Sequence, residues 1–501
     1  MKSPPHPKVE LLEDIDDYIK TVVNVDQEGA KILATKCAPT LRNSKFVQIL
    51  KEGLHGVAVL RIPQDHYVVV HSACGNHLLD LKAHVHSMVD NLVKQAKAIN
   101  AIPIGFADVI DWSGEESLIE GIGEALVQAA NQFNLPVLNG ENAVLGERVT
   151  CGANVSGTMV SMISKKEKLP LESIPGVFEK DKTRYAVFDA EGKAVFINSD
   201  GVGTKTEFYE RAKKYVLAVG DSFAMKVDDA SKLGAIPKVV ADVIEFKGEI
   251  PVDEIVAYGQ REAKEFNCLY LMQEVRAENR IKGYKEDVPS FNLSGSVVSV
   301  IDEARLKKPP LPQVGDELVA IRGKANPRSN GITSKRKGML LLGDSWCKLH
   351  GVEEWHETPE GQHFLAYLAE PSTVFYPVFN ELLEKNLASA VFHISGGAYE
   401  SKLARPLARQ GLFARLEFLF APDLREIALM NVLGKRIRDV YAQWPMGTEG
   451  FITTSDAEKA IKVLQSYGLE AKKVGVVEKA LDRKGIVFQA FNGEEVYFSG
   501  N

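Results

Sequence analysis

Short apolar runs alternate with amphipathic stretches along most of the chain. The apolar runs are bounded by small or turn-forming residues, which is typical of buried strands. Stretches such as 85–99 and 117–133 have the periodicity of helices that bury one face. Strands are predicted at 67–70, 102–110, 135–138, 155–163, 194–197 and 317–321. Strands that alternate with helices indicate an α/β or α+β fold.

The front half of the chain contains an internal repeat. The pattern Ile-Pro-x-x-x-Ala-Asp-Val-Ile begins at Ile102 and returns at Ile236, 134 residues later. The strand at 155–163 returns at 293–301, 138 residues later. Because the landmarks keep their order and spacing, we predict a tandem duplication, with two unrelated α/β segments as the alternative.

Three domains follow from the repeat and from the Pro-rich stretches. The expected domains are 1–168 (copy one), 184–308 (copy two) and 313–501 (an unrepeated C-terminal α/β domain). A linker is predicted at about 165–183, and a hinge at 307–312. A chain of 501 residues is too long for a single core, which agrees with this division.

Composition narrows the class of protein. Apolar residues make up 45% and charged residues 25%, as in ordinary globular proteins. The net charge of −7 gives no reason to expect a nucleic acid or an anionic membrane as partner. No apolar run approaches the roughly 20 residues that span a bilayer, and the N-terminus lacks the apolar core of a signal peptide. Five scattered cysteines without a CxxC pair fit reduced thiols, so we expect a cytoplasmic protein.

A charged glycine loop follows the strand at 194–197. It reads Ser199-Asp200-Gly201-Val202-Gly203-Thr204-Lys205. Its two glycines allow the backbone to approach a ligand closely, and an Asp and a Lys at its ends fit a metal ion beside phosphate oxygens. The loop is not a Walker A motif, because Ser199 and Thr204 stand where that motif needs glycine. A solvated surface turn is the alternative.

Two adjacent acids follow on a predicted helix. Asp228 and Asp229 could converge with Asp200, although adjacent acids are often only a solvated helix face. Two carboxylates about 4 Å apart repel by about 4 kcal/mol at an effective dielectric near 20. A cation would relieve this repulsion, and oxygen ligands indicate Mg²⁺ with a bound polyphosphate.

Together these motifs resemble the aminoimidazole ribonucleotide synthetase superfamily. This superfamily also includes formylglycinamidine ribonucleotide synthase, selenophosphate synthetase, thiamine-phosphate kinase and a hydrogenase-maturation protein. Residues 200–205 match its D-G-V-G-T-K motif, and 227–229 with 234–237 are similar to V-N-D-x₄-G-A-x-P, with Asp228 in place of Asn. Residues 139–142 resemble G-G-E-T, 327–331 resemble H-S-N-G, and 393–397 resemble H-x-[ST]-G-G. The segment Tyr18–Gly29 faintly resembles an N-terminal family motif, in an unsettled register.

Each copy departs from the motifs where the other keeps them. In copy one, residues 72–78 replace the loop and lack both the acid and the lysine, and an ungapped count places Lys94 and Gln95 where copy two has Asp228 and Asp229. In copy two, residues 272–275 replace 139–142 and are expected to keep only the Glu. The superfamily builds its ATP site from the metal loop of one copy and the G-G-E-T segment of the other. The resemblance therefore implies an intramolecular pseudo-dimer around a shared sheet or barrel, with one surviving site. A pseudoenzyme is the alternative.

The resemblance also implies roles for individual residues. ATP would contact Asp200, Gly201, Gly203, Thr204, Lys205, Asn139, Gly140, Glu141 and Asn142, and Mg²⁺ would bind Asp200, Asp228 and Asp229. Asp229, Lys205 and His393 are the candidate catalytic residues, with His393 a candidate for proton transfer. A phosphoribosyl substrate would contact Arg328, Ser329, Asn330, Gly331, Gly396 and Gly397. The N–H groups at the start of a predicted helix at 332–342 could hold its phosphate, and an ordinary N-cap by Ser329 or Asn330 is the alternative.

The implied reaction is ATP-dependent ring closure of formylglycinamidine ribonucleotide to aminoimidazole ribonucleotide, a step of purine biosynthesis. Another ATP-dependent ligase or kinase of the superfamily and an inactive nucleotide-binding scaffold remain alternatives. A monomer or a homodimer is expected. The histidines between His66 and His86 lack the spacing of a zinc site and stay unassigned.

Overall fold

The computed structural model describes residues 28–43, 48–50, 59–76, 80–277, 280–324 and 327–500. Residue contacts divide the chain into two compact units. Unit 1 comprises 1–206 and 235–307, and unit 2 comprises 207–234 and 308–501. The segment 207–234, which we expected in the domain of copy two, therefore belongs to the C-terminal unit. The motif Tyr18–Gly29 lies almost entirely outside the described residues.

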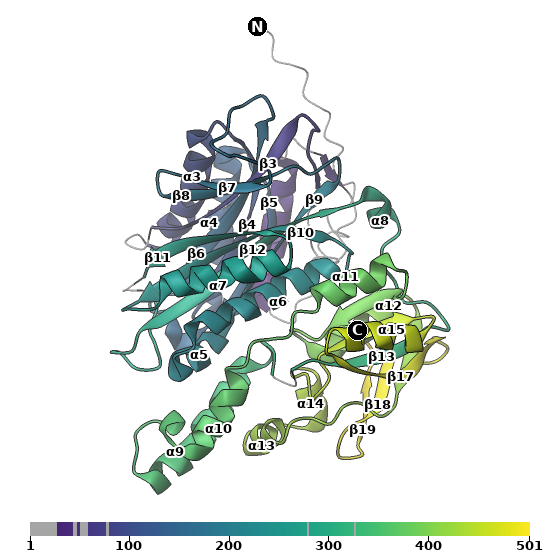
Figure 1. Ribbon diagram of the computed structural model, residues 1–501. Coiled ribbons are helices and arrows are strands. Elements are labelled where there is room, and N and C mark those ends of the chain that lie inside the picture. The colour runs from purple at the N-terminus through teal and green to yellow at the C-terminus, as the bar shows by residue number, and fades with distance from the viewer. Residues whose placement is uncertain are drawn as a thin grey trace. The chain divides into compact units, whose positions relative to one another are not determined.

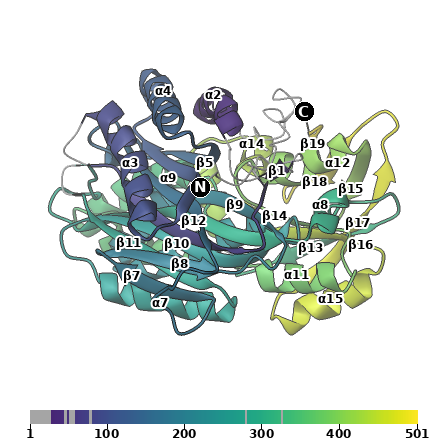
Figure 2. The same ribbon diagram turned by 90° about the horizontal axis from the view of Figure 1, so that it is seen from above.

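Copy one forms a six-stranded sheet in unit 1 (Figure 1). Its strands are β3 (His66–Cys74), β4 (Ile102–Trp112), β5 (Val137–Val144), β6 (Ala153–Ser164), β7 (Gly176–Lys180) and β8 (Thr183–Phe188), in the order β5-β4-β6-β3-β8-β7. Helices α2 (Glu28–Cys37), α3 (Leu81–Ala98) and α4 (Glu116–Phe133) lie together on one face of this sheet (Figure 2). Their apolar sides bury Met88 and Leu126 against Phe106 of β4.

Copy two forms a second six-stranded sheet with the same arrangement. Its strands are β9 (Ala194–Gly201), β10 (Ile236–Lys247), β11 (Leu269–Arg276) and β12 (Ser290–Ile301), with β1 (Gln48–Leu50) and β2 (Val59–Arg61), in the order β1-β2-β9-β12-β10-β11. Helix α7 (Val252–Glu265) packs on β11 so closely that a Cβ at Gly259 would lie 2.2 Å from the Tyr270 ring. The four repeated strands β3 to β6 thus correspond in order to β9 to β12, as the repeat predicted.

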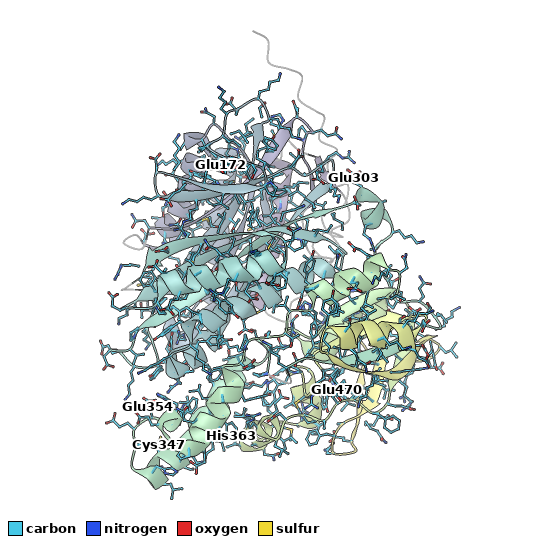
Figure 3. All side chains as sticks on the ribbon, viewed as in Figure 1. Glu172, Glu303, Cys347, Glu354, His363 and Glu470 are labelled. Atoms are coloured by element: carbon cyan, nitrogen blue, oxygen red, sulfur yellow. The ribbon has the colours of Figure 1, made fainter. Side chains whose placement is uncertain are left out.

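Each sheet is completed by the hairpin that precedes the other copy. Strand β8 precedes copy two in the chain, yet it pairs with β3 of copy one. Strand β2 precedes copy one, yet it pairs with β9 of copy two, with Leu60 opposite Val195. Arg61 of β2 donates two hydrogen bonds of 2.7 and 2.6 Å to Glu303, which begins α8 (Glu303–Lys307) directly after β12 and is labelled in Figure 3. The predicted pseudo-dimer is confirmed, and the predicted linker at 165–183 is corrected, because it contains strand β7.

One apolar core joins the two sheets. It contains Val70 and Leu138 of copy one together with Val195 and Val298 of copy two, all with almost no exposed surface. Burial of this kind is worth about 1.5–3 kcal/mol for each large aliphatic side chain. The copies are therefore parts of one folded unit rather than two separate domains.

Unit 2 is built around a seven-stranded sheet. Its strands are β13 (Glu317–Arg322), β14 (Ala390–His393), β15 (Leu412–Leu416), β16 (Gly450–Thr454), β17 (Glu470–Lys479), β18 (Gly485–Gln489) and β19 (Glu495–Phe498), in the order β14-β16-β13-β17-β15-β18-β19. Its helices include α6 (Ala218–Ser231), α9 (Ile332–His350), α10 (Pro359–Leu368), α11 (Tyr376–Glu384), α12 (Arg405–Arg409), α13 (Leu424–Val432), α14 (Ile437–Tyr441) and α15 (Ala457–Ser466). Helices α11 and α15 bury Phe379 and Leu464 against this sheet. The C-terminal α/β domain is thereby confirmed, with α6 added to it.

Within the described ranges, no helix combines the length and the apolar character that crossing a membrane demands. All five cysteines are free thiols.

Candidate functional site

The glycine loop forms the end of strand β9 in unit 1. Strand β9 ends at Gly201, and a short 3₁₀ turn (Gly203–Lys205) leads into α5 (Thr206–Ala212). Gly203 has a φ of +63°, and no atom lies within 4 Å of the place where its Cβ would stand. A side chain would be strained at this φ. The backbone of this turn is therefore open to a close neighbour, as the sequence predicted.

The loop carries its two charged residues in different environments. The Asp200 side chain accepts a hydrogen bond of 2.7 Å from the backbone N–H of Gly201 and is partly exposed. Lys205 has no exposed surface. A buried ammonium interacts more strongly with a phosphate than an exposed one, because the effective dielectric is lower.

Strand β5 of copy one lies beside this loop of copy two. The backbone N–H of Ser199 donates a hydrogen bond of 3.3 Å to the Asn139 side chain. A Cβ at Gly201 would lie 3.7 Å from Val109, which pairs with Glu141 in the copy-one sheet. The structure thus brings the two halves of the predicted ATP site, 139–142 and 199–205, together within unit 1.

The mirror-image position in copy one has lost its charges. Gly157 of β6 and Gly295 of β12 occupy equivalent positions in the two repeats. Gly295 pairs with Asp200, whereas Gly157 pairs with Ala73. On α3, Lys94 forms an ion pair with Asp90 at the surface. Copy one therefore presents an alanine where copy two presents the acid of the loop.

The β5 and β11 strands differ by one residue. In copy one, Phe106 pairs with Val137 but Ala107 pairs with Asn139, so Leu138 is an extra residue, a bulge. Strand β11 pairs with β10 without such a shift. The counterpart of Glu141 is therefore Gln273, which is opposite Val243 as Glu141 is opposite Val109. Our prediction that copy two keeps the Glu at this position is wrong, and the carboxylate exists in copy one only.

A buried polar group where the copies meet was missed in the sequence. We call Cys74, Asp111, Glu245 and Asn292 the junction cluster. The Asn292 amide donates hydrogen bonds to Asp111 at 2.6 Å and to Glu245 at 3.3 Å, and the Cys74 thiol donates one to Glu245 at 3.2 Å. The sequence did contain a signal for these two acids, because Asp111 and Glu245 directly follow the two copies of Ala-Asp-Val-Ile.

Burial governs the charge of the junction cluster. Loss of hydration, together with the carboxylates of Glu245 and Asp200, raises the pKa of Asp111 to about 7, and the hydrogen bond from Asn292 opposes this rise. Burial also raises the pKa of Glu245. Asp200 is thus near enough to Asp111 to interact with it electrostatically.

In unit 2, Asp228 has a structural role. Its Oδ1 accepts hydrogen bonds from the backbone N–H groups of Phe375 and Tyr376 at 2.8 and 2.9 Å, at the start of α11. Its Oδ2 accepts one from Arg328 at 3.1 Å, and both side chains are buried. Burial raises the pKa of Asp228 to about 7 against the lowering effect of Arg328. We therefore remove Asp228 from the expected metal ligands.

Arg328 is likewise occupied inside unit 2. Besides Asp228, its guanidinium donates to the Thr373 carbonyl at 2.9 Å, lies 3.7 Å from Glu449 and stacks on the Phe375 ring. Only 2% of its surface is exposed. The predicted phosphate fork is corrected to a structural arginine.

The rest of the 327–331 loop is held by the C-terminal core. Asn330 donates a hydrogen bond to the Ile394 carbonyl at 2.8 Å, and a Cβ at Gly331 would clash with the Trp444 ring at 2.1 Å. Gly331 begins α9 without a side-chain cap, so neither Ser329 nor Asn330 is the N-cap. The Ser329 hydroxyl is buried without a hydrogen-bond partner among the described residues. Its predicted role in substrate binding stays open.

Asp229, by contrast, meets several cations. It forms an ion pair with Lys232, one turn further along α6, and its Oδ1 lies 3.6 Å from Nε2 of His393. Burial alone would raise the pKa of Asp229, but Lys232, His393 and Lys402 hold it well below its usual value. Burial lowers the pKa of Lys232 to about 8, although Asp229 opposes that shift. The i, i+3 spacing of Asp229 and Lys232 was the sequence signal we missed.

His393 ends strand β14 and has no exposed surface. Neither ring nitrogen has a hydrogen-bond partner in the part of the chain that the structure describes. Burial and the charge of Lys232 lower the pKa of His393 well below its usual value, so the ring is neutral. The glycine turn follows, with Gly396 open to space and Gly397 at a φ of +74°.

The implied magnesium does not fit these residues. Asp228 is paired with Arg328 and backbone donors, and Asp229 is paired with Lys232. Over the ranges that the structure describes, no group of three or more His, Cys, Asp or Glu side chains could hold a metal ion. No metal centre is therefore assigned within either unit.

The described histidines of copy one contact groups close to them in the fold. His71 contacts the Leu92 carbonyl at 2.9 Å, and His86 contacts Gln132 at 2.7 Å. His84 accepts a hydrogen bond from the Val155 N–H at 3.2 Å, and His66 pairs with Asp65. His77 lies outside the described residues.

Comparison with known proteins supports the duplication. The family model described as AIR synthase related protein, N-terminal domain, matches two segments, residues 55–163 and 182–294. Similar curated proteins include phosphoribosylformylglycinamidine cyclo-ligases of Bacillus cereus, 24% identical over 66% of this chain and 91% of theirs, and of Brevibacillus brevis, 25% identical over 64% and 87%. Among solved structures, thiamine-monophosphate kinase from Stenotrophomonas maltophilia is 14% identical, with a TM-score of 0.41 over 64% of this chain and 93% of that one. At this TM-score the likeness carries no further conclusion.

Proposed function

Because this chain belongs to the AIR synthase related superfamily, we propose that it converts formylglycinamidine ribonucleotide and ATP into aminoimidazole ribonucleotide, ADP and phosphate. One observation carries the proposal: the Asn139 side chain of copy one binds the backbone of the copy-two glycine loop at Ser199. The relatives named as cyclo-ligases, of which 87–91% is covered, support this reaction over others of the superfamily.

The nucleotide is proposed to bind where strand β5 meets the glycine loop. The phosphates would contact the backbone of Gly201, Gly203 and Thr204, and the 139–142 segment would face them from copy one. Gly203 leaves space for this contact, since its missing side chain would meet nothing within 4 Å. Only one such site is expected, because Ala73 and Gln273 replace the two carboxylates at the mirror-image position.

The reaction joins two steps. The formyl amide oxygen of the substrate attacks the γ-phosphorus of ATP, ADP leaves, and an iminophosphate forms. A neighbouring nitrogen then attacks the activated carbon, the five-membered ring closes, and phosphate leaves. The Lys205 ammonium would offset the charge that develops on the transferred group, and holding the nitrogen in attack geometry would supply much of the rate.

His393 is proposed as the proton carrier in unit 2. The neutral ring has an unprotonated nitrogen for the proton that the ring-closing nitrogen loses, and Asp229 at 3.6 Å would stabilise the imidazolium against the effects of burial and Lys232. The Gly396–Gly397 turn beside it is proposed to admit the phosphoribosyl group.

The test combines the full chain with ATP, Mg²⁺ and formylglycinamidine ribonucleotide and follows the ring-closed product. Lys205→Gln should lower kcat by about 10²–10³, whereas Lys94→Gln, which removes an exposed lysine of copy one, should not change it. ATP binding without ring closure would contradict the cyclo-ligase and favour another ligase or kinase of the superfamily. Absence of nucleotide binding would contradict an ATP enzyme and favour a scaffold.

A further inference from the structure

Four titratable side chains of unit 2 form a group that we call the Asp229 cluster. They are Asp229 of α6, Lys232 at the C-cap of α6, His393 of β14, and Lys402 of the helical turn at 400–404. Lys232 contacts Asp229 directly, His393 approaches it to 3.6 Å, and Lys402 is near enough to both Asp229 and His393 to interact electrostatically. One carboxylate thus faces two ammonium groups.

The neighbouring acid adds no free negative charge. Asp228 is neutralised by Arg328 and by two backbone N–H groups. A divalent cation beside Asp229 would meet the ammonium of Lys232 within the same contact, where like charges repel each other. The arrangement therefore opposes a metal ion at Asp229.

A buried polar side chain lies beside these ammonium groups. His393 has no exposed surface, and both its ring nitrogens lack hydrogen-bond partners in the described ranges. Buried polar atoms of this kind are rare without a water or ligand to satisfy them. The Gly396–Gly397 turn follows the same strand, and Gly396 has no atom within 4 Å of its missing side chain.

We propose that Lys232 stands in for a divalent cation at Asp229, so that the Asp229 cluster is a metal-free site for a phosphate-bearing anion, with Lys232 and Lys402 as its cations. A phosphate oxygen bound here would contact the ammonium groups of Lys232 and Lys402 and the backbone of the Gly396–Gly397 turn. The anion site rests on the proposed function and deepens it, because the Gly396–Gly397 turn is also where the phosphoribosyl group is proposed to bind. The tests below use neither ATP nor that substrate.

The first test measures Mn²⁺ binding to the full chain, without nucleotide or substrate. It asks whether the Lys232 ammonium occupies the place of a divalent cation. Lys232→Gln should bind one more equivalent of Mn²⁺ than the unchanged protein, because Asp229 loses its internal cation. The double variant Asp229→Asn with Lys232→Gln should bind no extra Mn²⁺, and Lys232→Arg should behave as the unchanged protein. Electron paramagnetic resonance counts the bound ion.

The matched control is Lys459→Gln. Lys459 pairs with Asp456 at the same i, i+3 spacing, but at the surface of α15. The proposal would be overturned if the unchanged protein bound a Mn²⁺ ion that Asp229→Asn alone abolishes. It would also be overturned if Lys232→Gln kept the melting temperature of the unchanged protein and bound no additional Mn²⁺.

Inorganic phosphate in the presence of EDTA tests the anion. Its affinity, measured by calorimetry, should fall about 10-fold or more in Lys402→Gln, since hydrogen bonds to charged groups contribute about 1.5–3 kcal/mol. Lys459→Gln should leave it unchanged. Phosphate binding that requires Mg²⁺, or that is the same in Lys402→Gln, would contradict the site. The Mn²⁺ and phosphate measurements contain neither ATP nor formylglycinamidine ribonucleotide. Their outcome therefore does not change if the chain has no cyclo-ligase activity, and failure of the two proposals can be told apart.

Discussion

Copy one and copy two share a topology but carry different chemistry at the same place. At the end of β9, copy two has Asp200, Gly203 and Lys205, whereas the matching strand β3 of copy one ends in Ala73 and Cys74. Across the sheet, copy one has Glu141 where copy two has Gln273. A homodimer must keep both halves of a site in every chain. Fusion of the copies removes that constraint, so each half can be lost once.

The comparison also shows what neither copy can lose. Both sheets depend on a hairpin from the other copy, and both contribute to one apolar core. Ser156 and Ser294, which hold equivalent positions in the repeat, meet at 3.2 Å between their hydroxyl oxygens. Packing is therefore kept in both copies while the site residues diverge.

The exchanged hairpins give the largest expected effect. Phe188→Ala should destabilise unit 1 by about 3–5 kcal/mol and Leu60→Ala by about 2–5 kcal/mol, because both side chains are buried in the core that the two sheets share. Urea unfolding of the full chain measures the change. The control is Val177→Ala on β7, an exposed position where about 0.5 kcal/mol or less is expected. If Val177→Ala and Phe188→Ala lowered the free energy of unfolding equally, burial of one face of the β7–β8 hairpin would not be what holds it to the sheet.

Much of this fold could be predicted from the sequence, for a physical reason. The strands of each copy are long apolar runs, so the pattern of burial alone identifies them, and the fixed spacing of Ile102 and Ile236 identifies the duplication. The hairpin exchange could not be predicted, because β1 and β2 contain only three residues each and their partners lie far along the chain. Pairing between distant strands leaves no local signal.

The site was predicted in part for a similar reason. Residues 139–142 and 199–205 carry motifs, so their meeting could be expected. The bulge at Leu138 could not, because nothing in the local sequence marks the extra residue, and the match of Glu141 to Gln273 depends on it. The pairing of Asp228 with Arg328 joins residues 100 positions apart and also lacks a local signal.

The second prediction sharpens the comparison at the site itself. Glu141→Ala should lower kcat/KM of the proposed reaction by about 10²-fold, because it removes the carboxylate that only copy one supplies; losses of this order follow the removal of one preorganised group from an active site. Gln273→Ala, at the matching position in copy two, should change it by about twofold or less. Steady-state kinetics with ATP as the varied substrate measures both. Equal losses in the two variants would show that the mirror-image site is also used.

The smallest expected effect concerns the junction cluster and pH. Asp111 is buried, and its pKa is about 7 in the folded protein, above the usual value for an aspartate. Between about pH 4 and 7 the folded state therefore binds more protons at Asp111 than the unfolded state, so this group makes stability fall as pH rises through that window. Asp111→Asn removes the titration and keeps an oxygen that can accept the hydrogen bond from Asn292.

Between pH 5 and pH 7.5, Asp111→Asn should therefore lose less stability than the unchanged protein, by about 1–2 kcal/mol. Urea unfolding at the two pH values measures the difference. Asp287→Asn, which removes an exposed carboxyl of the same unit, makes the same change in net charge and should follow the unchanged protein. Glu245 and Asp200 of copy two help to keep Asp111 protonated. If the stability of Asp111→Asn and Asp287→Asn changed equally with pH, Asp111 would not hold a proton in the folded protein.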